Sequence, residues 1–527
     1  MADKVDIKHL EFAQAAAEEG QAATDQYGHS LVEFDPAAER RLRWKIDLVI
    51  TPIICLLYLF CFIDRANIGN AALAGLKQDL SLEGYDYNVL LTVFYISYII
   101  FEIPCNMACK LIGPGWFLPF LALCFGICSI GTAFVHSLGA ACGVRFLLGK
   151  TLDQVCPLFD RSRSVRSGHA AWNRLLLFQV VSQRRAGIST VTCKCRRFPN
   201  AKSLTSQYIT MAPLGGAFGG LLASAILKLS HFGGLHRWRM IFAIEGIITC
   251  GIALVAFAVL TDRPETARWL SEEEKKLAVA RVKSERVGTT EVLDKLDVPK
   301  TLKGIFSPVT LLTGFIFLLN NITVQGMSFF LPTIVRSIYP DSTVISQQLR
   351  SAPPYVVGAF FTLMFPFLSW RFDRRVIFFI ASSPLMIAGY AMFLGSIDSN
   401  VRYGATFLVA SGAFAFGALC NAHVSANVVS DTARSAAIGT NVMIGNIGGM
   451  ISTWSYLDRD APNYHIGNGL NCASATLTLI CSVLLLLWMK YDNKKRDGRD
   501  VDSQLVGLST KQVQDLDWKH PGFRWRP

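Results

Sequence analysis

Residues 116–135 read WFLPFLALCFGICSIGTAFV, a run of twenty residues without a charged side chain. Lipid offers the backbone no hydrogen-bond partner, and a helix of about 20 apolar residues crosses a bilayer, so this run predicts a membrane-spanning helix. Residues 470–489, LNCASATLTLICSVLLLLWM, have the same character. The chain is therefore expected to lie in a membrane.

Ten further runs contain few ionisable residues, so we expect twelve spans. Six precede a hydrophilic stretch and six follow it, which predicts an all-α membrane protein made of two six-helix bundles. The expected spans are 46–63, 89–108, 116–135, 138–148, 208–226, 240–260, 309–331, 353–370, 376–397, 404–424, 436–456 and 470–489.

Five parts follow from this pattern. The two bundles are predicted at 46–261 and 304–490, joined by a central loop at 262–303 that mixes both signs of charge at helical spacing. The remaining parts are tails at 1–45 and 491–527. Lys and Arg near the ends of spans favour the cytosolic side, and their placement predicts that both tails are cytosolic.

Composition supports a membrane protein and excludes several other classes. Of 527 residues only 17% are charged, against about a quarter in soluble domains. The net charge of +12 arises mostly at 150–207, which holds 11 Lys and Arg against two acids, so we expect no nucleic-acid-binding face. The 14 cysteines and nine histidines show no metal-ligand spacing, and no catalytic set stands out. We expect neither a metal nor an enzyme.

Several local motifs resemble one family of transporters. The chain is similar to the major facilitator superfamily and, more narrowly, to the fungal anion:cation symporters, the allantoate and nicotinate permease group. The motifs that carry the resemblance are FIDRANIGNA at 62–71, FEIP at 101–104, RFLLG at 145–149, IEG at 244–246, RPETARWL at 263–270 and DAPNY at 460–464.

This resemblance implies a transporter in which two bundles alternately expose a central site to either side of the membrane. It further implies proton-coupled uptake of a small organic anion by a monomer at the plasma membrane, driven by the proton gradient without a bound cofactor. Export of a metabolite or drug is the alternative, and a membrane protein without transport activity is another. The sequence does not identify the substrate.

Ionisable residues within spans are costly, so they are candidates for function. Asp64 and Arg65 end the first span, where a carboxylate beside a cation can exchange a proton while the arginine attracts an anion. In the resembling symporters this pair acts with a span 4 arginine, here Arg145. The alternatives are a solvated pair for Asp64 and Arg65 and a structural ion pair for Arg145.

A second tier of residues is expected to line the cavity or to pin helices together. Glu102 and Glu245 are interpreted as pinning residues, because they lie near the ends of their spans. Amides in spans 7 and 11 can do either. A gating turn is expected after span 8, by resemblance. The amides are Asn320, Gln325, Asn441 and Asn446, and the turn contains Asp373, Arg374 and Arg375.

The segment 150–207 departs from the resembling family. A glutamate of the family, seven residues after Arg145, is replaced by Leu152, and no spanning run follows until residue 208. An eleven-residue span 4 at 1.5 Å per residue cannot cross a core of about 30 Å. Span 4 is thus expected to be truncated or disrupted, either by a genuine cytosolic insertion or by a gene-model error, such as a retained intron or a shifted reading frame, that would leave the product inactive.

Overall fold

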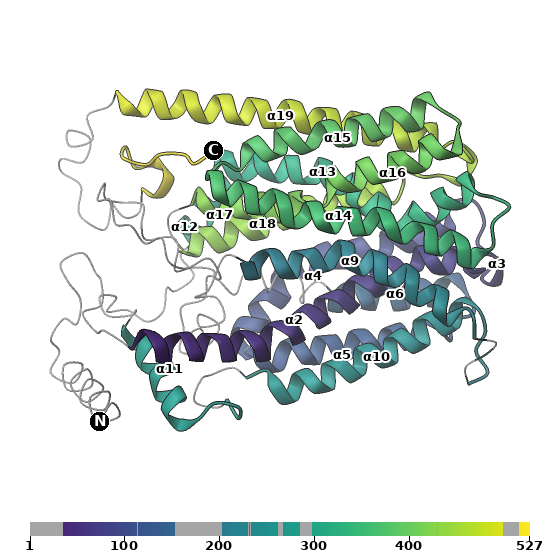
Figure 1. Cartoon of the computed structure of the whole chain (residues 1–527), viewed down its shortest axis with the longest axis horizontal. Helices are drawn as coiled ribbons and strands as arrows, with labels where there is room; N and C mark the ends of the chain where they lie inside the picture. The colour runs from purple at the N-terminus through teal and green to yellow at the C-terminus, as the bar shows by residue number, and fades with distance from the viewer. Residues whose placement is uncertain are drawn as a thin grey trace.

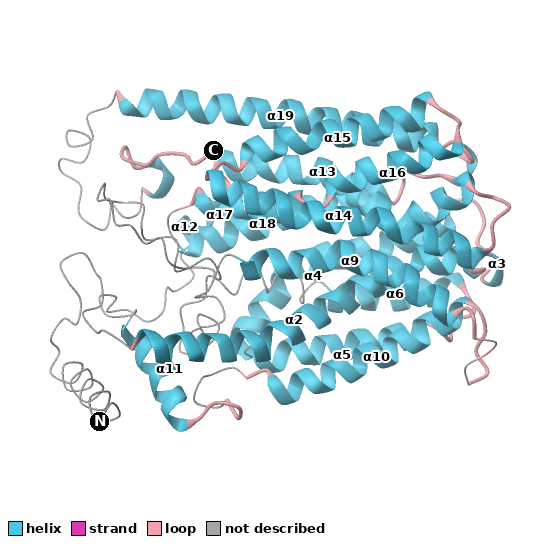
Figure 2. Cartoon of the chain, viewed as in Figure 1, coloured by secondary structure: helices cyan, strands magenta, loops and turns pink. Residues whose placement is uncertain are grey.

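The computed structural model describes residues 35–112, 114–152, 203–229, 231, 233–261, 267–284, 298–428, 431–498 and 516–527. The described regular structure is helical and contains no strand (Figure 2). The anomalous segment 150–207 and the tail 1–45 fall largely outside these residues. The long helices lie roughly side by side along one direction (Figure 1).

The helices of the first half follow the expected runs, with ends extended beyond the apolar residues. Asp35 caps the first helix by accepting hydrogen bonds from the amides of Ala37 and Ala38. The helices are α2 (Pro36–Leu73), α4 (Asp86–Ile112), α5 (Pro114–Thr132), α6 (Leu138–Leu152), α9 (Ser203–Ile226) and α10 (Trp238–Val259), with a short α3 (Leu76–Asp79).

The second half repeats this arrangement after two helices in the central loop. The central helices are α11 (Glu272–Ser284) and α12 (Val298–Ile305). The helices of the second half are α13 (Pro308–Ile338), α14 (Val344–Phe372), α15 (Val376–Gly395), α16 (Ser399–Ala413), α17 (Phe416–Ala426), α18 (Asp431–Ser452) and α19 (His465–Asp497).

Eight of the described helical segments are long and apolar enough to cross a membrane, and three shorter apolar helices accompany them. The expected tenth span corresponds to α16 and α17 together, which are separated by Phe414 and Ala415. Both of these residues keep helical φ with ψ near −22°, the geometry of a tightened 3₁₀ turn, so the path of the chain continues. The number of twelve spans stays a prediction.

The α6 helix, the expected fourth span, is longer than its apolar run. It continues from the expected end at residue 148 to Leu152, where the described part stops. Its 15 residues correspond to about 22 Å of helix, less than the hydrocarbon thickness. The described part of this helix is therefore too short to span a bilayer.

The two halves contact each other at one end of the molecule, which we call the closed end. Here Asn88 Nδ2 donates to the Thr453 carbonyl at 2.6 Å. Lys77 Nζ lies 2.8 Å from Asp458. A Cβ built on Gly69 would lie 2.5 Å from the carbonyl oxygen of Phe329, so backbones meet there. The beginning of α2 and the last turns of α19 lie at the opposite end (Figure 1).

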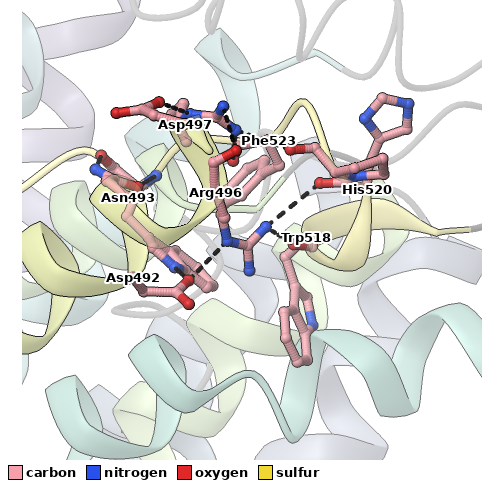
Figure 3. A network of polar contacts seen from close by, with 10 residues as sticks. Asp492, Asn493, Arg496, Asp497, Trp518, His520 and Phe523 are labelled. Carbon is pink, nitrogen blue, oxygen red and sulfur yellow. Dashed lines mark hydrogen bonds and ion pairs between the residues drawn. The ribbon is translucent and has the colours of Figure 1, made fainter. Parts of the chain in front are cut away.

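Residues 516–527, which we call the C-terminal strap, pack back onto the second half. Trp525 is buried, and its indole N–H donates to Asp492 at 2.7 Å. Arg496 donates to the carbonyl oxygens of Trp518 and His520 at 3.0 and 3.3 Å (Figure 3). The strap thus fixes the end of α19.

The strap also reaches the ends of two other helices. The side-chain amide of Asn427, just after α17, donates to the Arg526 carbonyl and accepts from the Arg526 backbone amide. The Arg375 amide donates to the Pro527 carbonyl at 3.1 Å. Helix α19 continues to Asp497, and the strap packs against the second half; the expected boundary of the tail at 491–527 stays a prediction. The aromatic residues of this polar segment provide the apolar surface that holds it there.

Candidate functional site

Asp64 lies near the closed end of α2 and points into the first bundle. Its carboxyl is buried, with 4% of the residue exposed. Ser129 of α5 donates to Oδ1 at 2.9 Å, and Thr249 of α10 donates to Oδ2 at 3.2 Å. Two hydroxyl donors stabilise an ionised carboxylate that has left water. The solvated ion pair considered as an alternative for Asp64 is therefore not the arrangement found.

Arg145 of α6 lies within electrostatic reach of Asp64. The two charges attract each other, but no ion pair is formed. Arg145 is 3% exposed, and its guanidinium carbon lies 5.6 Å from the centre of the Phe242 ring. Its Nε and Nη2 have no hydrogen-bond partner in the described part of the chain. A buried guanidinium with unused donors can accept a carboxylate ligand.

Arg65 follows Asp64 in the chain but faces different neighbours. Its guanidinium carbon lies between 5.3 and 5.5 Å from the centres of three rings, those of Phe62, Phe94 and Tyr98. Rings at these distances attract a cation through their quadrupoles. The structure thus brings Asp64 near Arg145 and turns Arg65 toward α4.

Glu245 of α10 is fully buried beside this group. Its carboxyl and that of Asp64 are close enough for their charges to repel. Neither oxygen of Glu245 has a hydrogen-bond partner among the described residues. The described residues therefore do not supply the pinning hydrogen bond expected for Glu245, and its role stays a prediction. Glu102 belongs to α4, but its side chain lies outside the described residues.

The amide residues of the second bundle lie apart from this group and mostly join helices. Asn320 donates to the Ala413 carbonyl at 3.0 Å, and Asn441 donates to Asn421 Oδ1 at 2.7 Å. Gln325 is buried, and its Oε1 has no hydrogen-bond partner in the described ranges. Asn446 is buried within α18.

The expected gating turn connects α14 and α15. Asp373 ends α14 in the left-handed conformation, with φ of 51°. Its Oδ1 lies 3.4 Å from Nη2 of Arg375, the residue that also holds the strap. Arg374 donates its backbone amide to the Ser369 carbonyl at 3.2 Å. The turn is thus tied to its own bundle.

Sequence reasoning missed Ser129 and Thr249. Each is a small hydroxyl residue in an otherwise apolar helix, and such residues are common wherever helices pack. The available signal was helical spacing: Thr249 lies one turn after Glu245, on the same face of α10. No group of three or more His, Cys, Asp or Glu suited to a metal ion occurs in the described residues.

Comparison with known proteins agrees with this architecture. The family model for the Major Facilitator Superfamily matches residues 196–453. An uncharacterized transporter of Schizosaccharomyces pombe is 30% identical over 473 residues, which cover 89% of this chain and 87% of the relative. The chain belongs to the major facilitator superfamily. It is accordingly a multi-pass membrane transporter and not an enzyme.

Other relatives place the chain among fungal transporters of this superfamily. The high-affinity nicotinic acid transporter of Saccharomyces cerevisiae is 26% identical over 489 residues, which cover 92% of this chain and 85% of the relative.

Solved structures share the fold at low identity. A bacterial homologue of the human lysosomal transporter Spinster has a TM-score of 0.58 at 14% identity, covering 86% of this chain and 97% of the homologue. The xylose transporter XylE of E. coli has a TM-score of 0.55 at 15% identity, covering 81% of this chain and 97% of XylE.

Proposed function

We propose that this chain is a proton-coupled symporter that takes up a small organic anion, a carboxylate, by alternating access. One observation carries the proposal: Arg145 is buried within electrostatic reach of the Asp64 carboxyl, and its Nε and Nη2 have no hydrogen-bond partner among the residues that the structure describes. A buried cation with free donors suits an anionic solute, and the neighbouring carboxyl suits a proton.

The chemistry of coupling follows from competition for Arg145. An ionised Asp64 offers the arginine a negative charge, whereas a protonated Asp64 leaves the guanidinium free for a carboxylate. Binding of the anion then favours protonation of Asp64, so the proton and the anion travel together. Release of the anion restores the attraction between Arg145 and Asp64 and favours loss of the proton.

The orientation of the chain in the membrane is proposed from the charges at the ends of the helices. Lys and Arg gather at the end where α2 begins and α19 ends, and such residues favour the cytosol. On this orientation both termini are cytosolic, and the closed end faces the outside of the cell. The chain would then act as a monomer in the plasma membrane. The S. cerevisiae relative supports a carboxylate such as nicotinate as the first substrate to test.

The test is uptake by yeast cells that lack their own nicotinate transporter and express this chain. Radiolabelled nicotinate is the first probe, followed by allantoate and other small carboxylates. We expect uptake to increase as the external pH falls and to collapse when an uncoupler is added. The Arg145→Gln variant, which removes the charge, should lose uptake, whereas Arg350→Lys at the edge of the second bundle should keep it.

Three results would overturn the proposal. Uptake that does not depend on the proton gradient would contradict the proposed proton coupling. Uptake by the Arg145→Gln variant at the wild-type rate would contradict the proposed anion site. Loss of a preloaded compound from expressing cells, without accumulation of any carboxylate, would indicate export instead of uptake.

A further inference from the structure

Glu245 is a buried carboxyl that joins no helices through hydrogen bonds in the described part of the chain. It is 0% exposed, and neither of its oxygens has a hydrogen-bond partner in the part of the chain that the structure describes. A buried acid that pins helices does so through hydrogen bonds to its neighbours. An ionised carboxylate without donors in such a place would be very costly.

Helix geometry directs Glu245 toward the site described above. Phe242, Glu245 and Thr249 are spaced three and four residues apart, so they share one face of α10. Thr249 donates to Asp64, and the Ser129 hydroxyl, which donates to Asp64 at 2.9 Å, lies 3.4 Å from the Phe242 carbonyl oxygen. Glu245 lies between these two contacts along the helix.

Close packing of α10 against α5 keeps the surroundings of Glu245 dry. A Cβ built on the adjacent Gly246 would lie 2.8 Å from the Gly126 carbonyl oxygen and 2.7 Å from Ile130. The two backbones are thus in contact beside the acid, as small residues permit. Asp64, by contrast, accepts from two hydroxyl groups. The two neighbouring carboxyls therefore have very different support for a negative charge.

The charges around Arg145 indicate what the second carboxyl contributes. If Asp64 and Glu245 were both ionised, their two negative charges would compete with an incoming anion for Arg145 and for the neighbouring Arg65. If both carry a proton, neither carboxyl competes, and Arg145 can bind the anion. The anion therefore enters most readily when both carboxyls are neutral.

We propose that Glu245 is a second proton-carrying residue, which takes up and releases a proton together with Asp64 in each transport cycle. Two protons then accompany each anion. At each carboxyl one O–H bond forms on loading from the outer solution and breaks on release to the cytosol, and the proton leaves with the solvent. This inference rests on the proposed function and assigns the second carboxyl to α10.

The first experiment measures the pH dependence of nicotinate uptake in the wild type and in Glu245→Gln, an isosteric variant that cannot ionise. Over the titrating range the wild-type rate should change by up to 100-fold per pH unit, because two protons are involved, and the rate of E245Q by at most tenfold. Asp64→Asn should resemble E245Q. Glu83→Gln, at an exposed carboxyl before α4, should match the wild type.

Each outcome is decisive. An identical pH dependence for the wild type and E245Q would overturn the role of Glu245 while leaving the proposed function intact. Wild-type uptake that ignores pH would instead overturn the proposed function. If E245Q does not reach the membrane, the ratio of protons to anions entering with the wild type decides: two supports the inference, and one overturns it.

A second measurement needs no transported solute. Infrared difference spectra of the purified protein in lipid should show the carbonyl band of a buried carboxylic acid that disappears as the pH is raised. The contribution of Glu245 should be missing from E245Q, which keeps that of Asp64, and E83Q should match the wild type. A Glu245 band that persists at every pH, or spectra that are the same for the wild type and E245Q, would overturn the proposal.

Discussion

Asp64 and Arg65 are adjacent in α2, yet they face different helices. Asp64 accepts hydrogen bonds from Ser129 of α5 and Thr249 of α10, whereas Arg65 lies among rings that include Phe94 of α4. Successive residues of an α-helix are about 100° apart around its axis, so neighbours in sequence need not share a partner. Each of the two charged residues can therefore be substituted without altering the contacts of the other.

Substitution of Arg65 should change substrate affinity without changing proton coupling. Arg65→Lys keeps the charge but replaces a planar group that stacks well on rings by a compact ammonium. The loss of about 1 kcal/mol of cation–π attraction predicts a KM raised about fivefold and an unchanged pH profile. Uptake kinetics at several pH values measure both. A flattened pH profile in R65K would contradict the separation of roles.

Even a conservative substitution of Arg145 should impair uptake. Lysine cannot present the planar fork of donors that matches a carboxylate, so Arg145→Lys is expected to lower uptake at least tenfold, about 1.4 kcal/mol. Counterflow of nicotinate, which needs binding but no gradient, should fall equally. Arg350→Lys, which alters an arginine 3.9 Å from the Tyr339 ring, is the matched control. Normal counterflow by R145K would count against an anion at this residue.

The ion pair between Lys77 and Asp458 should favour the state in which the closed end is shut. Reversing either charge alone replaces attraction by repulsion, and reversing both restores the pair. Exposed pairs contribute about 0.2 to 1 kcal/mol, so a modest opening is expected. The buried Thr453, changed to cysteine, reports it through reaction with a membrane-impermeant maleimide. Labelling that stays high in the double reversal would exclude an effect of the pair.

The C-terminal strap should contribute to the stability of the second bundle. Trp525 is 2% exposed and packs against Trp488, Trp518 and Phe523. Trp525→Ala should cost about 3 to 5 kcal/mol and lower the melting temperature in detergent. Trp44→Ala, at a position 60% exposed, should change it little. Equal melting temperatures for the two variants would show that the strap is dispensable.

Helix α11 should loosen from α2 in acid. Partial burial raises the pKa of Glu274, but hydrogen bonds from Lys45 and Ser271 outweigh it, so the pKa lies below its ordinary value. The stabilisation is therefore present above the ordinary glutamate pKa and is lost as the pH falls through the lowered one. Hydrogen exchange of α11 should rise over this range in the wild type. Glu274→Gln should show no such dependence, and equal pH dependence in both proteins would contradict the assignment.

The positions of the helices could be predicted because each apolar run must satisfy its own backbone in lipid. Even the start of α11 has a local signal, since Ser271 and Glu274 form a capping box with two reciprocal hydrogen bonds. Predicted ends fell short where polar turns extend a helix beyond the hydrocarbon, as at the end of α19. The number of spans depends on the length of each helix as well as on its polarity. Helix α6 is apolar, but its described 15 residues are too short to cross the bilayer, so the sequence pattern does not decide whether it is a span.

The sequence predicts Asp64, Arg65 and Arg145 as site candidates and Glu245 as a helix-pinning residue, and these roles stay predictions. Asp64, Arg65, Arg145 and Glu245 stand out in the sequence because an ionisable side chain within a span has a high free-energy cost and is therefore rare. Which of them lie together in space depends on how each helix is rotated about its axis. A helix that is apolar on all sides gives no signal for that rotation. It could therefore not be predicted that Arg65 and Asp64 face different helices. Nor could it be predicted that the carboxyl of Glu245 has no hydrogen-bond partner among the described residues.

The close approach of Gly69 to Phe329 has a consequence for how the molecule moves. Tyr95 is packed in the same way against Gly449, and Tyr355 against Gly216. A gap of about 0.5 to 1 Å already removes about a quarter to a half of the dispersion attraction between such surfaces. Partial separation of the halves would thus lose a large share of their attraction early, so we expect partly separated states to be sparsely populated.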